Sequence, residues 1–224
     1  MNNDRTMLRF AACIAWLGML FAANAFADFP EVSPDGLHLV KRSGVAVVYV
    51  RPGASLKPYS KFAILQCTVA FKPNWREDMQ TEYNTPITDG QIHQIESEVA
   101  AAFKQVFTTT LSGGGYPVVD TAGPDVVVLR PGILNLSIAA PAVNLENPGQ
   151  QTFATSAGSM TLVLEFYDSV SSQLLARVID PQTSSDYGIF TWQSGTGNVS
   201  AAEGVMKKWA DTLLHYMEAA HGAQ

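Results

Sequence analysis

The feature that most constrains the fold is the alternation of residue types over residues 160–167. From Met160 to Phe166 every second residue is apolar, and the residues between them include Glu165. Successive side chains of a strand point to opposite faces, so this pattern predicts a strand with one apolar face. A polar turn over residues 168–173 follows, and residues 174–179 are predicted to return as the second strand of a hairpin. Other elements of the chain must therefore cover the apolar face.

Other β-branched runs predict further strands. They lie at residues 45–50, 61–71, 116–119 and 126–136. The last run is expected to be broken or bulged at Pro131-Gly132, because proline lacks a ladder N–H and glycine weakens a strand. Residues 75–86 are polar, and only a connection is expected there.

Two amphipathic helices are also predicted. Thr88 and Gln91 match a capping box, after which apolar residues at spacings of three and four continue to about Leu111. A run of three glycines at residues 113–115 is expected to end this helix. Ser200 and Glu203 form a second box before a terminal helix with its own apolar stripe. The element order predicts an α+β fold, a single domain with a mainly antiparallel or mixed sheet and two principal helices packed on one face.

The first 27 residues have the pattern of a secretory signal peptide. Arg5 and Arg9 precede an apolar run at residues 10–26, which closes on the small residues of Ala25-Phe26-Ala27. A transmembrane anchor is the alternative, but the run falls short of the roughly 20 strongly apolar residues that span a bilayer. Most of this apolar run follows Cys13, whereas a lipoprotein signal has its apolar run before the cysteine. We therefore predict cleavage after Ala27, a periplasmic or secreted location, no lipid anchor and no integral membrane span after cleavage.

The remaining residues are predicted to hold a flexible leader at 28–44 and the α+β domain at 45–224. Residues 1–27 hold two of the 14 basic and one of the 20 acidic residues, so their removal leaves a formal charge of −7. An acidic chain without a Lys/Arg cluster argues against a nucleic-acid partner, because phosphates require clustered positive charge.

The sequence predicts no catalytic residue, no metal site and no cofactor. Cys67 lies in an apolar run and is expected to be a small buried side chain. The four histidines lack metal-ligand spacing. Glu165 and Asp168 are the best carboxylate pair, but three residues apart on a strand they point to opposite faces. Asp168 is expected to bond turn amides, and Glu165 to form an ion pair with Arg130 or Arg177 across the sheet.

Two loop segments are candidates for binding. Tyr187, Phe190 and Trp192 lie in a Gly/Ser-rich stretch, where exposed aromatics can bind a glycan, a peptide or a protein surface. They could instead fold back on the core. Residues 139–158 form a long loop that could act as a lid over an apolar cavity.

Three stretches together resemble a bacterial exported family of uncharacterised proteins, domain of unknown function 3313 (DUF3313). They are Tyr49-Val50-Arg51-Pro52-Gly53 leading to Lys61, Tyr116-Pro117-Val118-Val119-Asp120 with Gly123-Pro124-Asp125, and Glu165-Phe166-Tyr167-Asp168-Ser169 with Leu174-Leu175-Ala176. Trp209 also fits. The resemblance implies fold and export. Many members look like lipoproteins, whereas this chain has no lipobox at the position that lipidation requires. In the hairpin turn, Ser171-Ser172 stands where the family usually has a Thr-Gly pair.

These observations favour a non-enzymatic envelope protein that binds an envelope protein or a cell-wall component. Two alternatives remain open at the level of sequence. One is an envelope hydrolase whose carboxylates are brought together only by the fold. The other is a carrier of a small ligand, which predicts an enclosed apolar cavity.

Overall fold

The computed structural model describes residues 29–40, 46–83, 86–138, 158–183 and 200–222. In chain order they form β1 (His38–Val40), β2 (Val47–Val50), β3 (Lys61–Ile64), β4 (Thr68–Phe71), α1 (Trp75–Tyr83), α2 (Asp89–Gly113), β5 (Val126–Ser137), β6 (Ser159–Asp168), β7 (Leu174–Thr183) and α3 (Ser200–Gly222). The sheet has the order β1-β2-β7-β6-β5-β3, and β4 also pairs with β5. Strands β3 and β4 run parallel to β5, and the other pairs are antiparallel. The predicted α+β fold with a mixed, mainly antiparallel sheet is confirmed.

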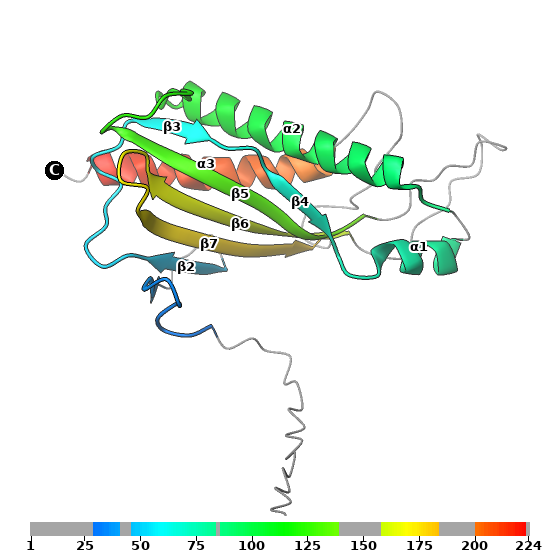
Figure 1. Ribbon diagram of the computed structural model, residues 1–224. Helices are drawn as coiled ribbons and strands as arrows, with labels where there is room; N and C mark the ends of the chain where they lie inside the picture. The colour runs from blue at the N-terminus through cyan, green and yellow to red at the C-terminus, as the bar shows by residue number, and fades with distance from the viewer. Residues whose placement is uncertain (1–28, 41–45, 84–85, 139–157, 184–199, 223–224) are drawn as a thin grey trace, which may run out of the picture.

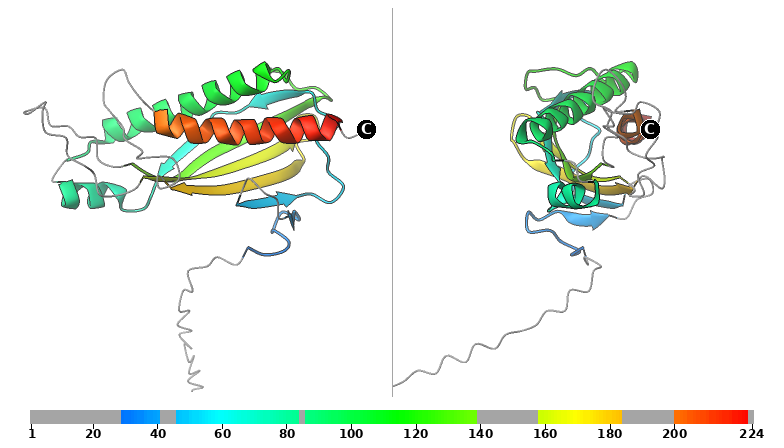
Figure 2. Two further views of the ribbon diagram at one scale, coloured as in Figure 1. Left: turned by 180° about the vertical axis from the view of Figure 1, so that it is seen from behind. Right: turned by 90° about the vertical axis from the view of Figure 1, so that its right-hand side faces the viewer.

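Helices α2 and α3 lie side by side on one face of this sheet (Figures 1 and 2). The main core fills the layer between the helices and the strands. Its fully buried side chains include Phe103 and Phe107 of α2, which stack at 4.0 Å between ring centroids, and Met206 and Met217 of α3. The two helices thus bury the apolar face that the alternation over residues 160–167 requires.

The central hairpin has the predicted arrangement. Leu162 and Leu164 of β6 are 2% and 3% exposed and face the helices, while Glu165 lies on the opposite face, which we call the outer face. In the antiparallel register Glu165 is opposite Arg130 of β5 on one side and Arg177 of β7 on the other. One cross-strand row therefore places two arginines beside one carboxylate.

The start of α2 also follows the sequence. The backbone N–H of Gln91 donates to the Thr88 side chain at 3.3 Å, and the N–H of Thr88 donates to Gln91 Oε1 at 2.9 Å, so the predicted capping box is confirmed. At the other end α2 stops at Gly113, and Gly115 has a φ of 88°, a conformation that glycine adopts without strain.

The predicted strand at 61–71 is divided into β3 and β4, and the cause is Pro131. The N–H of Leu65 donates to Leu129 O at 2.9 Å, so the next bond of a parallel ladder would need an N–H at residue 131. Proline has none, and pairing resumes at Thr68 opposite Gly132. The break predicted at Pro131-Gly132 was wrong for β5 itself, which stays continuous there and has its irregularity between Leu134 and Ser137.

Helix α1 was not expected, since residues 75–86 are polar overall. Two apolar side chains one turn apart hold it: Trp75 and Met79 are 2% and 4% exposed. Trp75 stacks on Phe71 at 4.2 Å, and its indole N–H donates to Ile138 O at 3.2 Å. The predicted strand at 116–119 is reduced to one bridge between Val118 and Phe62.

Part of the segment expected to be a flexible leader packs on the outer face. Leu37 is fully buried with Val47, Tyr49 and Leu174 in a second, smaller core, and β1 pairs with β2. Tyr49 donates its hydroxyl to Pro30 O at 2.9 Å. An apolar side chain buried against two strands explains why these residues join the domain.

Candidate functional site

Glu165 is the most buried carboxylate on the outer face, with a side chain only 7% exposed. Arg130 Nε donates to Glu165 Oε2 at 2.7 Å, and Arg177 Nε donates to Oε1 at 2.8 Å. The Tyr167 hydroxyl donates to Oε2 at 2.9 Å, and the Arg130 guanidinium lies 5.1 Å from the centre of the Tyr167 ring. The expected ion pair is confirmed, and Glu165 makes it with both arginines.

The electrostatics of Glu165 follow from these contacts. Burial by itself raises the pKa of this carboxyl, but hydrogen bonds from Arg177, Tyr167 and Arg130 outweigh burial, so the net pKa is lowered. The side chain stays ionised, and both of its oxygens are engaged by donors. A general acid or base requires a pKa near the working pH, so this arrangement is typical of a structural ion pair rather than a catalytic one.

Asp168 has a separate role at the hairpin turn. Its Oδ1 accepts from the N–H groups of Val170 at 3.1 Å and Ser171 at 2.6 Å, which confirms the expected bonds to turn amides. The backbone bond from Ser171 is the main cause of a lowered Asp168 pKa. Tyr59 donates its hydroxyl to Oδ2 at 2.9 Å, and burial, together with this bond, raises the Tyr59 pKa to about 12. Glu165 and Asp168 thus serve different partners and form no joint site.

The other candidates for chemistry are inert or dispersed. Cys67 is 5% exposed, and burial raises the pKa of its thiol to about 12, so it is not a thiolate at neutral pH. Within the ranges that the structure describes, no group of three or more His, Cys, Asp and Glu side chains could hold a metal ion.

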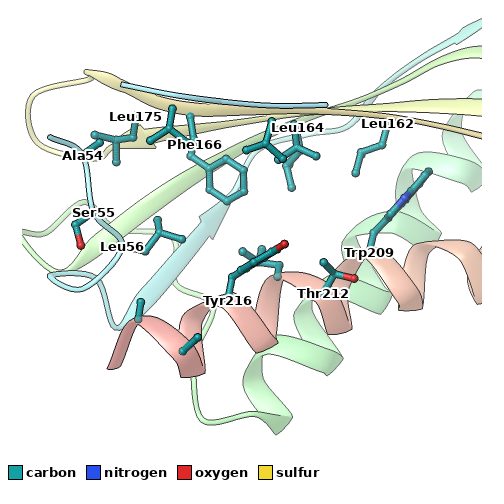
Figure 3. A pocket seen from close by; sticks show the side chains of 17 residues that line it. Ala54, Ser55, Leu56, Leu162, Leu164, Phe166, Leu175, Trp209, Thr212 and Tyr216 are labelled. Carbon is teal, nitrogen blue, oxygen red and sulfur yellow. The ribbon is translucent and has the colours of Figure 1, made fainter. Parts of the chain in front are cut away.

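An apolar groove lies between α3 and the helix-facing side of β2, β6 and β7 (Figure 3). Its volume is about 380 Å³. Leu162, Leu164 and Phe166 of β6 form the floor, and the segment Ala54-Ser55-Leu56 borders one end. On α3 the wall consists of Trp209, Thr212, Leu213, Tyr216, Ala219 and Ala220. None of the described lining residues is charged, so the groove suits an apolar ligand.

Trp209 is fixed at the other end of the groove by a buried hydrogen bond. Its indole N–H donates to Asp180 Oδ2 at 2.6 Å, and Asp180 is itself 3% exposed. Gln182 Nε2 also donates to Asp180 Oδ2 at 2.8 Å, and the backbone N–H of Ala46 donates to Oδ1 at 3.3 Å. These bonds join β7 to α3 and hold the ring as a rigid part of the wall.

A depression lies beside the groove on the solvent-exposed side of α3. It is lined by Gly204, Lys207, Lys208, Asp211, Thr212, His215 and Tyr216. Thr212 and Tyr216 line both hollows, so the groove and the depression lie on adjacent sides of α3. Lys207 Nζ pairs with Asp211 at 2.7 Å.

The binding residues predicted from sequence, Tyr187, Phe190 and Trp192, lie outside the described residues, as do residues 139–157 of the proposed lid. The groove was missed. Met206, Trp209, Leu213 and Met217 were correctly predicted as a stripe, and all are buried. The available signal was the width of the apolar sector, which extends past that stripe to Tyr216 and Ala220.

A family model described as "Protein of unknown function (DUF3313)" matches residues 32–213. The chain belongs to this family. The DUF3313 match begins at residue 32 and so includes the segment that packs Leu37 on the outer face. A search of curated proteins found no match. Among the described residues, no helix has both the length and the apolar character needed to cross a bilayer.

Several solved structures share the arrangement of elements only remotely. A single-residue variant of the PelC dodecamer from Paraburkholderia phytofirmans matches at 12% identity and a TM-score of 0.38, over 76% of this DUF3313 chain and 95% of that chain. The PelC dodecamer from the same organism matches at 13% identity and a TM-score of 0.36, over 73% and 95%. A homolog of a neuraminyllactose-binding hemagglutinin from Helicobacter pylori matches at 10% identity and a TM-score of 0.30, over 72% and 89%.

Proposed function

We propose that this protein is an exported, non-enzymatic binding module of the cell envelope and that the groove between α3 and the sheet is its ligand site. The observation that carries the proposal is a cavity of about 380 Å³ whose described lining has no charged side chain. This volume lies in the lower part of the range of roughly 300–1,000 Å³ that is usual for small-molecule sites. The signal-peptide pattern of residues 1–27 supports the location.

The contacts of the carboxylates favour binding over hydrolysis. Glu165 is held by two arginines and a tyrosine, and Asp168 is held by turn amides and Tyr59. An envelope hydrolase would need an acid and a base in one cleft with access to substrate. The apolar groove supports the carrier alternative in a modified form, since its described walls leave one side open rather than enclosing a cavity.

Binding can be tested with N-phenyl-1-naphthylamine, an uncharged probe whose fluorescence rises in apolar surroundings. The mature chain is expected to bind it, and Ala220→Leu, which adds three carbons to the groove wall, is expected to weaken binding about tenfold. The matched control is Ala101→Leu, which changes an exposed alanine of α2 in the same way and should leave binding unaltered.

A second variant guards against misfolding of the first. Ala176→Leu fills the groove from β7, and its circular dichroism and melting temperature are compared with those of the parent. If well-folded Ala176→Leu and Ala220→Leu both bind the probe like the parent, the groove is not the site. Export is tested separately by N-terminal sequencing of the envelope fraction, in which Asp28 is the expected first residue.

A further inference from the structure

The groove is bounded at one end by a side chain that reaches from the helix to the sheet. Trp209 projects from α3, and its indole N–H donates to Asp180 Oδ2 on β7 at 2.6 Å. Asp180 stands opposite Leu162 of the groove floor in the β6–β7 register. Because a hydrogen bond joins α3 to β7 at this point, the gap between helix and sheet closes here (Figure 3). A ligand in the groove therefore ends at the Trp209 ring.

The opposite end of the groove is crossed by the connection between β2 and β3. These strands lie far apart in the sheet, with β7, β6 and β5 between them, so residues 51–60 must pass across the ends of those strands. A turn bond from the Tyr59 N–H to Leu56 O at 3.0 Å holds the connection. Leu56 packs on the main core and lines the groove at the end away from Trp209 (Figure 3). Leu56 is therefore the second end wall.

Two polar side chains of the lining already bond within the protein. Ser55 Oγ accepts from the Lys57 N–H at 3.1 Å, and the Thr212 hydroxyl donates to Lys208 O at 2.8 Å. β2, β7 and β6 each have a strand on both sides in the sheet, so the groove offers no free strand edge to an extended peptide. Such walls, which also lack a charged group, fit an occupant that brings no polar group into the groove, namely a hydrocarbon chain.

The distance between the two end walls limits the length of that chain. From Trp209 to Ala220 the α3 wall measures about 16 Å of helix at 1.5 Å per residue. An extended hydrocarbon with C–C bonds of about 1.5 Å advances roughly 1.25 Å per carbon, so about 12 carbons span this length. The adjoining depression on α3 is lined mainly by polar side chains, so methylene groups that enter it gain less free energy than those in the groove.

We propose that the groove binds a single unbranched hydrocarbon chain and selects it by length, with Leu56 as the residue that sets the limit. The polar end of the ligand lies in water, at the side that the described walls leave open. Trp209 is fixed by Asp180, so Leu56 is the end wall that a substitution can move without breaking a buried hydrogen bond. The proposal rests on the proposed function and adds the ligand class and a specificity-determining residue of the same site.

The test is displacement of N-phenyl-1-naphthylamine from the mature chain by octyl, decyl, dodecyl and tetradecyl maltoside, each below its critical micelle concentration. Their uncharged head groups are identical, so only the chain length varies. The apparent affinity is expected to rise about tenfold for each two carbons up to dodecyl, because every buried methylene adds favourable transfer free energy. From dodecyl to tetradecyl the rise should be less than about twofold, since the extra carbons stay outside the end walls.

Two substitutions of Leu56 should move this limit in opposite directions. Leu56→Ala shortens the side chain at the end wall, so tetradecyl maltoside should bind about fivefold better than dodecyl maltoside. Leu56→Phe lengthens that side chain, and the affinity should stop rising at decyl maltoside. The matched control is Leu65→Ala, at an exposed leucine that lines neither hollow, and it should keep the limit of the parent. Opposite shifts at one position would not arise from destabilisation, which lowers the affinity for every chain length alike.

The parent series tests the limit independently of the variants. A parent affinity that keeps rising from dodecyl to tetradecyl, or a limit that stays at dodecyl in both folded Leu56 variants, would overturn the length selection and leave the proposed function standing. If the probe does not bind the parent chain at all, the proposed function itself fails. If the probe binds and only an amphipathic peptide displaces it, the occupant is a protein segment and the hydrocarbon proposal is overturned.

Discussion

The two faces of the sheet are stabilised in different ways, although neighbouring residues of the same strands form them. Under α2 and α3 the side chains of β6 are Leu162, Leu164 and Phe166, which are stabilised by leaving water. One residue away, Glu165 lies on the outer face, where three side chains donate to its carboxylate. On the helix-covered face the described lining of the groove has no charged group. On the outer face both oxygens of Glu165 accept hydrogen bonds.

The comparison teaches where a ligand can bind. A buried charge that is fully hydrogen-bonded is costly to disturb, so the row of Arg130, Glu165 and Arg177 offers little to an incoming group. Along the groove between α3 and β7 the apolar walls stay apart, and filling this space with an apolar ligand would be favourable because it removes apolar surface from water. The groove is therefore the better candidate, although the outer face holds more of the side chains that sequence inspection selects.

The largest expected effect is on the helix-covered face. Phe103→Ala should lower the free energy of unfolding by about 3–5 kcal/mol, because it removes a fully buried ring that stacks on Phe107. Urea denaturation measures the change. Val170→Ala, at a position 66% exposed, is the control and should stay within about 0.5 kcal/mol of the parent. If Phe103→Ala lowers the free energy of unfolding no more than Glu165→Gln does, the helix-covered face does not contribute more to stability than the outer face.

An intermediate effect is expected from Glu165→Gln on the outer face. The amide keeps the shape of the side chain but loses the charge, and loss of such charge-assisted hydrogen bonds should cost about 1–3 kcal/mol at neutral pH. Arg130 is 57% exposed and can regain water, which limits the loss. Urea denaturation of both proteins gives the difference.

The stability difference between the parent and Glu165→Gln is expected to depend on pH. The Glu165 pKa is lower in the folded chain than its ordinary value of 4.5, so the ionised group stabilises the fold above about pH 4.5. That contribution is lost as the pH falls toward the folded-state pKa. The gap between parent and Glu165→Gln should therefore narrow below pH 4.5. A gap that stays constant through this range would show that the charge of Glu165 contributes nothing.

The smallest expected effect has the opposite sign and lies at the hairpin turn. Ser172 has a φ of 57°, in the left-handed region that costs a non-glycine residue roughly 1–2 kcal/mol. Ser172→Gly should raise stability by about 0.5–1 kcal/mol, since the extra freedom of glycine in the unfolded chain offsets part of the gain. A thermal melt measures the rise. Ser171→Gly is the contrast and should destabilise, because the Ser171 hydroxyl bonds Asp168 at 2.7 Å.

Local sequence patterns predicted much of the fold correctly. Residue alternation identified β6, the polar turn after it predicted the return strand β7, and Thr88 with Gln91 identified the start of α2, because each feature involves neighbours a few residues apart. The continuity of β5 and the division of β3 from β4 were not predicted. The missing N–H of Pro131 affects only its pairing with a strand far earlier in the chain, and that pairing is a tertiary fact.

The sequence by itself determined which residues of the central hairpin and of the two long helices must leave water, since apolar periodicity and capping chemistry are local properties of the chain. Only the tertiary structure decided that Glu165 would meet two arginines, that Asp180 would fix Trp209, and that α3 would stand apart from β7 and leave a groove. Each of these depends on how elements distant in sequence approach one another, because packing, unlike periodicity, is set by the shapes of several surfaces at once.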